Sequence, residues 1–203
     1  MKKITTIFFD IGGVCLSNGW DETAREKSTK KFSLDYEEME KRHKPLFKQF
    51  EKGKLSLDEY LNEVVFYQER DFSKKDFVKF MFSQSHPFDS TLKILNKLAS
   101  KKKYELATIN NESRELNDFR INEFGLKKYF RCFFSSCYMG VRKPEEEIFD
   151  KALHIFHKDP GECLYIDDRE ENYNAARNSG INSILLDKPE ILSSRLEKFN
   201  IEI

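Results

Sequence analysis

The sequence predicts an α/β fold: a parallel sheet with helices on both faces and a helical segment inserted after the first strand. Five short apolar runs have the composition of buried strands, and patterns of helical period separate the last four runs. The stretch 15–85, between the first and second runs, has helical patterns only. With 203 residues, the chain is long enough for one domain with an appended module.

The five expected strands are short and almost continuously apolar. They cover residues 4–9, 104–109, 132–136, 163–166 and 183–186. Apolar runs without alternation are typical of parallel strands that are covered on both faces. The sheet is therefore expected to lie inside the core.

Helical patterns connect the later strands. They cover residues 90–100, 113–124, 144–156 and 169–180. Pro144 is expected at the first helical position of its helix, where its missing N–H costs nothing, and acidic residues follow it in the first turn. Gly180 is expected to cap the end of the last of these helices.

The inserted segment divides the chain into two parts, a core of residues 1–14 and 86–203 and a helical insertion of residues 15–85. Amphipathic patterns over 33–53, 55–68 and 73–82 predict three helices, with Ser33 and Ser56 as N-caps and a break at Gly53. Loops between a strand and a helix are normally short, so an insertion of this length is expected to serve function.

Polar residues stand at successive ends of the expected strands. The set comprises Asp10 after the first strand, Asn110 and Asn111 after the second, Lys143 after the third, and Asp167 and Asp168 after the fourth. Ligands of open α/β sheets bind at this edge, so these side chains are expected to converge. Each residue alone is also explained as a helix cap or a surface charge, and it is the ordered set that favours a site.

Each residue type in the set has a chemical use. Asp10 with Asp168 would form a hard oxygen site for Mg²⁺, and Asp10 is also a possible nucleophile. Lys143 supplies a positive charge beside an anion. Asn110 and the start of the next helix offer hydrogen-bond donors to phosphate oxygens. The glycines at 12 and 13 leave space for close approach of an ion or substrate.

Composition argues against several classes of partner. Thirty-five basic and thirty-five acidic residues give a formal net charge of zero, which does not favour nucleic acid or an anionic membrane. No apolar run approaches the ~20 residues of a membrane span, and the N-terminus lacks the pattern of a signal peptide. The four cysteines have no zinc spacing, so free thiols in a reducing, cytoplasmic compartment are expected.

Four segments together resemble the haloacid dehalogenase superfamily of hydrolases, over the whole chain. They are "FFDIGGVCLSN", "LATINNESREL", "GVRKPEEEIF" and "CLYIDDREENYNAARNSG". The chain most resembles the phosphatase-like branch that includes the N-terminal domain of soluble epoxide hydrolase. The resemblance implies a Rossmann-like core, a small helical cap placed after the first strand, and Mg²⁺ as cofactor.

The resemblance also implies roles for the matched residues. Asp10 would be the nucleophile, Lys143 the lysine of the third motif, Asp168 a direct Mg²⁺ ligand and Asp167 its support. Asn110 takes the place of the usual Ser or Thr of the second motif, with Asn111 next, although Thr108 is a rival for that place. Asn172 matches a position that is often polar in this branch.

The first motif departs from the family pattern at Gly12. Phosphatases of this superfamily usually carry a second Asp there, which protonates the leaving group and later activates water. The Gly12 carbonyl can still bind Mg²⁺, as the family implies, but it cannot move a proton. General acid–base help is typically worth 10²–10⁴-fold in rate.

The expected function is therefore a Mg²⁺-dependent phosphatase of small phosphorylated metabolites that acts through an aspartyl-phosphate on Asp10. The alternative is a catalytically degenerate member that binds Mg²⁺ with a phosphate ligand or a protein partner. A dehalogenase is disfavoured by the Asp167–Asp168 pair, since displacement of halide needs no metal. The sequence leaves the oligomeric state open.

Overall fold

A computed structural model describes residues 2–203 of the chain. Within them a five-stranded parallel sheet runs in the order β3-β2-β1-β4-β5. The strands are β1 (Thr6–Phe9), β2 (Glu105–Asn110), β3 (Cys132–Ser135), β4 (Cys163–Asp167) and β5 (Asn182–Leu185). Each falls on one of the five expected runs, so the predicted parallel α/β sheet is confirmed.

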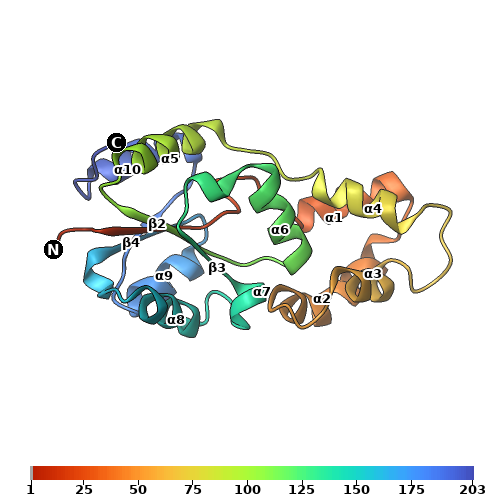
Figure 1. Cartoon of the computed structure of the whole chain (residues 1–203). Coiled ribbons are helices and arrows are strands. Elements are labelled where there is room, and N and C mark those ends of the chain that lie inside the picture. The colour runs from red at the N-terminus through yellow and green to blue at the C-terminus, as the bar shows by residue number, and fades with distance from the viewer. Residues whose placement is uncertain (1) are drawn as a thin grey trace.

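Helices cover both faces of this sheet (Figure 1). On one face lie α5 (Asp89–Lys101) and α10 (Leu192–Glu197), and on the other lie α8 (Glu146–Phe156) and α9 (Glu170–Asn178). The central strand shows the division, because Ile7 and Phe9 pack toward α5 while Phe8 packs toward α8. All three side chains are fully buried, as their unbroken apolar run predicted.

The remaining core elements are one further helix, α6 (Arg114–Glu123), and four short elements. The short elements are η1 (Leu126–Lys128), α7 (Ser136–Met139), η2 (Pro160–Glu162) and η3 (Pro189–Ile191). Two predicted helix ends were wrong by small margins. Helix α8 begins at Glu146, two residues beyond Pro144, and the C-cap of α9 is Ser179, so Gly180 follows the cap with a positive φ of 81°.

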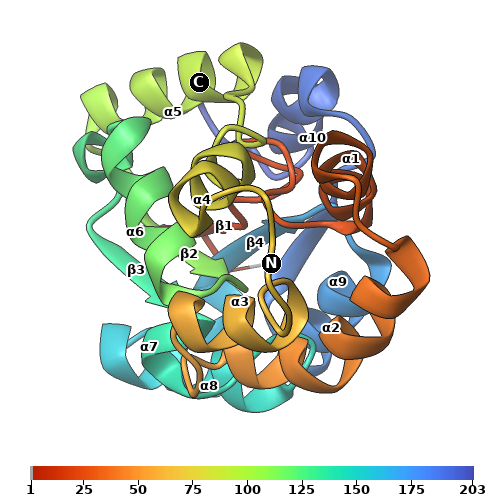
Figure 2. The same cartoon turned by 90° about the vertical axis from the view of Figure 1, so that its right-hand side faces the viewer.

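Four helices form the cap beyond the carboxyl ends of the strands. They are α1 (Glu22–Phe32), α2 (Tyr36–Glu51), α3 (Leu57–Val64) and α4 (Lys74–Phe82). Figure 2 looks onto these helices and shows them in front of the sheet. The predicted helical cap after the first strand is thus confirmed, whereas α1 is a helix that the sequence patterns did not identify.

The predicted caps of the inserted helices had different outcomes. Ser56 caps α3 in a reciprocal pair of hydrogen bonds with Glu59, as expected. The assignment of Ser33 was wrong, because Ser33 ends α1 in a left-handed conformation and Asp35 accepts the N-cap hydrogen bond of α2. Gly53 follows the end of α2 with a positive φ of 68°, in keeping with the predicted break.

The cap has a hydrophobic cluster of its own, which is rich in aromatic rings. Phe77 lies at its centre, fully buried, with the rings of Trp20 and Phe32 at 5.7 and 5.1 Å between centroids. The cluster also includes Leu116 of α6, so the cap packs directly on the core. The aromatic residues of the insertion therefore serve mainly to pack the cap.

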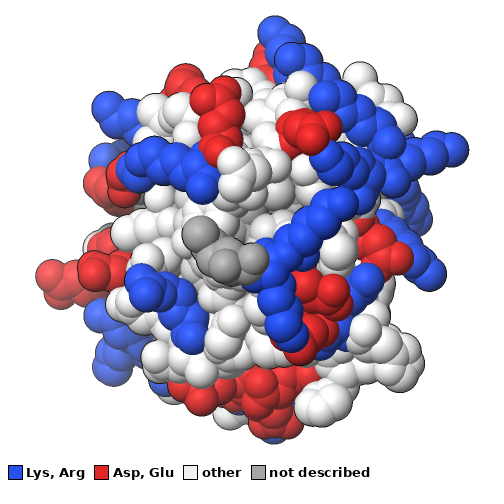
Figure 3. Space-filling model, turned by 90° about the vertical axis from the view of Figure 1, so that its left-hand side faces the viewer, with Lys and Arg blue, Asp and Glu red and all other residues white. Residues whose placement is uncertain are grey.

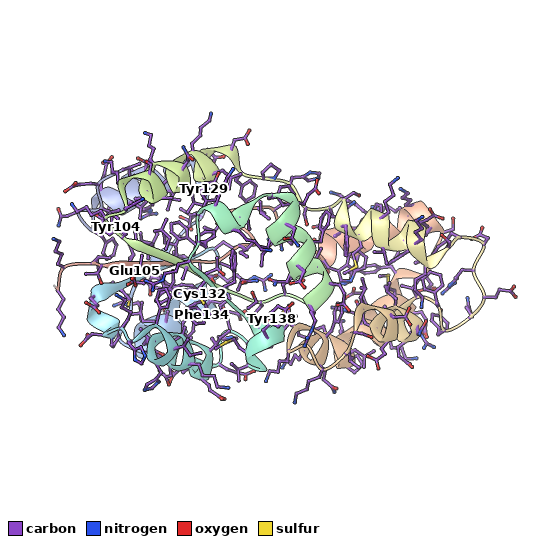
Figure 4. All side chains as sticks on the ribbon, in the orientation of Figure 1. Tyr104, Glu105, Tyr129, Cys132, Phe134 and Tyr138 are labelled. Atoms are coloured by element: carbon purple, nitrogen blue, oxygen red, sulfur yellow. The ribbon has the colours of Figure 1, made fainter. Side chains whose placement is uncertain are left out.

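The end of β3 leads the chain toward the cap. Figure 4 shows Cys132 and Phe134 along β3 and Tyr138 beyond them on α7. Tyr104 and Glu105 mark the start of β2, at the edge of the sheet away from the cap. Arg142, which follows α7, donates its Nε to Glu51 Oε2 of α2 at 2.7 Å. The cap is thus tied to the segment that carries Lys143.

The surface opposite the cap carries acidic and basic side chains next to each other (Figure 3). All four cysteines are free thiols, as expected. Among the residues that the structure describes, no helix is both long and apolar enough to cross a bilayer.

Candidate active site

Asp10 stands directly after β1, the central strand. Its N–H donates to the Ile166 carbonyl at 2.9 Å, so the pairing with β4 continues one residue beyond the strand. The chain then turns back on itself, because the Leu16 N–H donates to the Ile11 carbonyl and the Gly13 N–H donates to the Leu16 carbonyl, both at 2.8 Å. This turn fixes Asp10, a residue that is 7% exposed, at the edge of the sheet.

Gly13 explains why the turn needs a glycine. Its φ is +72°, a conformation that other residues adopt only with strain. A Cβ at Gly13 would also lie 2.1 Å from Asp168 Oδ2, which is a severe clash. The glycine therefore lets the loop after β1 close onto the carboxylate that follows β4.

Lys143 bridges the carboxylates of two neighbouring strand ends. Its Nζ lies 2.9 Å from Asp10 Oδ1 and 2.7 Å from Asp167 Oδ2, and its side chain is 1% exposed. Asn111 holds the backbone of Lys143 on both sides: Asn111 Oδ1 accepts from the Lys143 N–H at 2.8 Å, and Asn111 Nδ2 donates to its carbonyl at 2.9 Å. The structure thus brings Asp10, Asn111, Lys143 and Asp167 together.

Asp167 is fully occupied by hydrogen bonds. Besides Lys143, Tyr165 donates its hydroxyl and Asn172 its amide to this carboxylate, and the Arg169 N–H donates to Oδ1 at 2.8 Å. Burial raises the pKa of Asp167, but Lys143 and these donors together hold it below the usual range. Asp167 therefore acts as an anchor for its neighbours.

Asp168 differs from Asp167, because its Oδ1 is buried without a hydrogen-bond partner among the described residues. One oxygen from each of Asp10, Asp167 and Asp168 lies within 4.8 Å of the others. Three converging carboxylates with an orphaned buried oxygen fit a hard divalent cation such as Mg²⁺. Asp168, with Asp10 and the carbonyl of Gly12, would hold such an ion.

The electrostatics of the cluster also favour a cation. Burial raises the pKa of Asp10 to about 7, against the opposing effect of Lys143. Burial and the neighbouring Asp167 likewise raise the pKa of Asp168. A divalent cation beside these carboxylates would stabilise their ionised forms.

Asn110 is turned away from the cleft above Asp10. Its Oδ1 accepts from Ser135 Oγ at 2.9 Å and from Thr108 Oγ1 at 3.3 Å, and its Nδ2 donates to Asn117 Oδ1 at 3.0 Å. Both ends of the amide are thus occupied inside the core. Among the residues of the second motif, Asn111 lines the cleft and Asn110 and Thr108 do not.

A second ion pair, which the sequence did not reveal, lines the same cleft. Arg120 Nη1 of α6 donates to Glu112 Oε2 at 2.8 Å, and both side chains are buried. Glu112 directly follows the two asparagines at the end of β2, so its place at a strand end was an available signal. Its pairing with Arg120 depends on how α6 packs, and no pattern in the sequence predicts that contact.

The cap encloses a larger cavity, of about 980 Å³, next to this cleft. Aromatic rings and charges of both signs line it, among them Trp20, Arg25, Glu40, His43, Phe47 and Arg142. Glu51, Glu112 and Arg169 border both spaces, so the cavity adjoins the cleft above Asp10. A molecule in the cap cavity would therefore reach the carboxylate cluster.

A chain of hydrogen bonds joins Trp20 and His43, which line this cavity, through the hydroxyl of Tyr60. Trp20 Nε1 donates to the Tyr60 hydroxyl at 2.9 Å, and this hydroxyl lies 2.7 Å from His43 Nδ1. Indole only donates, so the hydroxyl accepts from Trp20, and its own proton can then be donated to Nδ1 of the imidazole tautomer that is protonated at Nε2. Burial and then Arg25 lower the pKa of His43 to about 4, so it is neutral near pH 7.

Comparison with known families identifies the family of this chain. A family model described as haloacid dehalogenase-like hydrolase matches residues 4–180, which include all four motifs. The chain belongs to this family of hydrolases. The resemblance found in the sequence is thereby confirmed, including its relation to epoxide hydrolases: bifunctional epoxide hydrolase 2 of Mus musculus is 32% identical over 73 residues.

Two relatives of this hydrolase match over most of its length. Flavin mononucleotide hydrolase 1 of Arabidopsis thaliana, a chloroplast protein, is 26% identical over 81% of the chain. D-ribitol-5-phosphate phosphatase of Bacteroides thetaiotaomicron is 24% identical over 87% of the chain and 89% of its own length. The chain spans 66% of the Arabidopsis protein and only 13% of the mouse epoxide hydrolase.

Solved structures of the same family have the same fold. A HAD family enzyme of Bacteroides thetaiotaomicron superimposes with a TM-score of 0.83 at 24% identity, over 96% of this chain and 99% of that one. The structure of that enzyme in complex with magnesium and inorganic phosphate gives a TM-score of 0.76 at 25% identity, over 89% and 93% of the two chains.

Proposed function

We propose that this hydrolase is a Mg²⁺-dependent phosphatase of small phosphorylated metabolites, with Asp10 as nucleophile. The observation that carries the proposal is the buried cluster of Asp10, Lys143, Asp167 and Asp168, in which one lysine faces two carboxylates and Asp168 Oδ1 has no partner. The relatives named for hydrolysis of flavin mononucleotide and ribitol phosphate support the same substrate class.

The chain's own residues account for the binding and attack steps. Lys143, at 2.9 Å from Asp10 Oδ1, would attract a phosphoryl group to the nucleophile and neutralise charge that develops during transfer. The free Asp10 oxygen would form a bond to phosphorus as the bond to the leaving oxygen breaks, which gives an aspartyl-phosphate. A bound Mg²⁺ would screen the carboxylates from the phosphate and act as a Lewis acid.

Phosphate binding is assigned differently from the family pattern. Asn110 was expected to contact phosphate, but its amide is occupied by Ser135 and Asn117 inside the core. We therefore assign phosphate contacts to Lys143 and the exposed part of the cleft near Asn111 and Arg169. The role of Asn111 is chiefly to position Lys143 through its backbone.

Gly12 and the inward turn of Asn110 favour a second candidate, a degenerate member that binds Mg²⁺ and a phosphate ligand without turnover. The two candidates separate in one assay. Purified protein is incubated with a panel of phosphate esters, with and without Mg²⁺, beside Asp10→Asn as a matched variant of nearly the same shape. Turnover that needs both Mg²⁺ and Asp10 supports the phosphatase, whereas Mg²⁺ and phosphate binding without turnover supports the binding protein.

A further inference from the structure

The place beside Gly12, where the family pattern has an acidic side chain, is bordered by Asn18 and Arg120. A Cβ built on Gly12 would lie 2.9 Å from Asn18 Oδ1 and 3.9 Å from Arg120 Nη1. The guanidinium of Arg120 therefore stands next to the place where an acidic side chain would otherwise point. Arg120 is itself fixed, since its Nη2 donates to the Ser17 carbonyl at 2.5 Å.

Arg120 binds the carboxylate of Glu112 near Gly12. Its Nη1 donates to Glu112 Oε2 at 2.8 Å, and the two side chains are 3% and 11% exposed. Glu112 lies in the loop between β2 and α6, so it reaches the position beside β1 from the neighbouring strand. A carboxylate is thus present near Gly12, although it comes from a different segment of the chain.

The loop after β1 leaves room for this pair. A Cβ at Gly19 would lie 3.0 Å from both Glu112 Oε2 and Arg120 Nη1, so a larger residue there would press on the pair. Glu112 also borders both the cleft above Asp10 and the cap cavity. A leaving group that passes from the cleft into the cap cavity would therefore pass beside Glu112.

We propose that Glu112 is the proton-transfer carboxylate of this hydrolase and replaces the side chain that Gly12 lacks. This inference rests on the proposed phosphatase function. Three carboxylates line both spaces, and they differ in where they bond. Asp21 accepts the N-cap hydrogen bond of α1, and Glu51 accepts from Arg142. Glu112 accepts within the cleft, from Arg120 at Oε2 and from the Ser113 N–H at Oε1.

Glu112 would transfer a proton in each half of the reaction. As Asp10 attacks phosphorus and the ester bond breaks, the leaving oxygen takes the proton of the Glu112 carboxyl and departs as an alcohol. Water then attacks phosphorus, the bond to Asp10 breaks, and Glu112 takes a proton from that water. Phosphate leaves, and both Asp10 and Glu112 regain their starting forms.

The surroundings suit both forms of Glu112. Burial raises the pKa of this carboxyl, Arg120 lowers it, and Glu51 of α2 raises it, with a net upward shift. Burial and Glu51 thus favour the protonated form, and Arg120 stabilises the carboxylate that remains after the proton has left.

The test compares two esters in one variant. p-Nitrophenyl phosphate needs little protonation of its leaving group, whereas glycerol 3-phosphate needs it strongly. We expect Glu112→Gln to lower kcat on glycerol 3-phosphate by about 10²–10⁴-fold and on p-nitrophenyl phosphate by less than about tenfold. Glu112→Asp should restore part of the loss on glycerol 3-phosphate. A purely structural role would lower both rates equally and leave their ratio unchanged.

Two further variants keep the test decisive. If Glu112→Gln does not fold because Arg120 is left unpaired, the double variant Glu112→Gln with Arg120→Met removes both charges. Glu51→Gln examines the competing carboxylate: because Glu51 helps to raise the pKa of Glu112, the ratio of the two kcat values should change less than in Glu112→Gln. The proposal alone is overturned if Glu112→Gln leaves the ratio of the kcat values on the two esters unchanged. It is also overturned if only Glu51→Gln changes that ratio. A wild-type protein inactive on both esters overturns it together with the phosphatase function.

Discussion

The two halves of the site, the core cleft and the cap cavity, are built in different ways. In the core, Lys143 and Asp167 are almost fully buried, and Lys143 Nζ contacts the carboxylates of Asp10 and Asp167 directly. The cap cavity is far larger, at about 980 Å³, and its charged side chains include exposed ones such as Lys41. The core cleft suits one small charged group, and the cap cavity suits the larger organic part of a ligand.

The difference follows from the elements that supply the residues. Adjacent parallel strands place Asp10 and Asp167 at one edge with little freedom. Helices α1 and α2 supply the cap cavity from long side chains such as Arg25 and Glu40, whose positions depend on packing. Changes in the core should therefore act on stability, metal binding and kcat, while changes in the cap should act on substrate affinity.

The largest effect is expected from Lys143→Met. Removal of this lysine leaves Asp10 and Asp167 facing each other in a buried site, so the free energy of unfolding should fall by about 3–5 kcal/mol at pH 7. Denaturant unfolding without Mg²⁺ measures the change. Lys151→Met, which removes an exposed pair with Glu147, should change it by less than about 0.5 kcal/mol. Similar values for both variants would contradict the contrast between core and surface charges.

The second effect is expected on the affinity for Mg²⁺. Asp168→Asn keeps the shape of the side chain but removes its charge, so we expect Mg²⁺ to bind on the order of 100-fold more weakly. Isothermal titration calorimetry gives the affinity directly. Asp150→Asn, a change at an exposed residue of α8, is the matched control and should bind Mg²⁺ like the wild type. Unchanged affinity in Asp168→Asn would place the cation elsewhere.

The core half of the site was accessible from sequence because strand ends are recognisable. Asp10, Asp167 and Asp168 follow apolar runs, and the sheet order brings those runs together. The orientation of Asn110 was not accessible, because it depends on whether its amide finds partners inside the core. Ser135 of the neighbouring strand β3 and Asn117 of the following helix α6 provide them.

The cap half was harder to predict for a physical reason. Helix α1 has only Ala24 as a buried apolar side chain, and its other buried residues are Arg25, Ser28 and Thr29. A helix that buries polar groups has no apolar stripe, so its period is invisible in a hydrophobicity pattern. The bidentate pair of Arg25 with Glu40, which compensates this burial, joins two helices and cannot be read from either alone.

The core should also respond to pH, with a sign opposite to that of the cap, where the lowered pKa of His43 makes its contribution to stability rise between about pH 4 and pH 6.5. Because the pKa of Asp10 is raised to about 7, the folded cluster holds a proton that the unfolded chain releases above its ordinary value of 3.8. The contribution of Asp10 to stability without metal should therefore fall as pH rises from about 4 to about 7, and comparison with Asp10→Asn isolates it. Mg²⁺ competes with this proton, so its affinity should rise with pH and level off above about 7.

Calorimetry in two buffers of different ionisation enthalpy checks this linkage. Binding at pH 6 should release a fraction of one proton, and binding at pH 8 should release almost none. His43 provides the contrast in the cap, because its pKa of about 4 keeps it neutral over the same range. Proton release that is equal at the two pH values would show that Asp10 is already ionised without metal.

The smallest effect on catalysis is expected from Tyr60→Phe in the cap. The change leaves Trp20 Nε1 and His43 Nδ1 without their shared partner, and the free energy of unfolding should fall by about 1–3 kcal/mol. Tyr60 does not line the cleft above Asp10, so kcat on p-nitrophenyl phosphate should stay within about twofold of the wild type. Tyr138→Phe, exposed on α7, is the control for loss of a hydroxyl and should be nearly neutral in both measurements. A large loss of kcat in Tyr60→Phe, with KM unchanged, would mean that the cap takes part in the chemistry and that the division between the two halves is wrong.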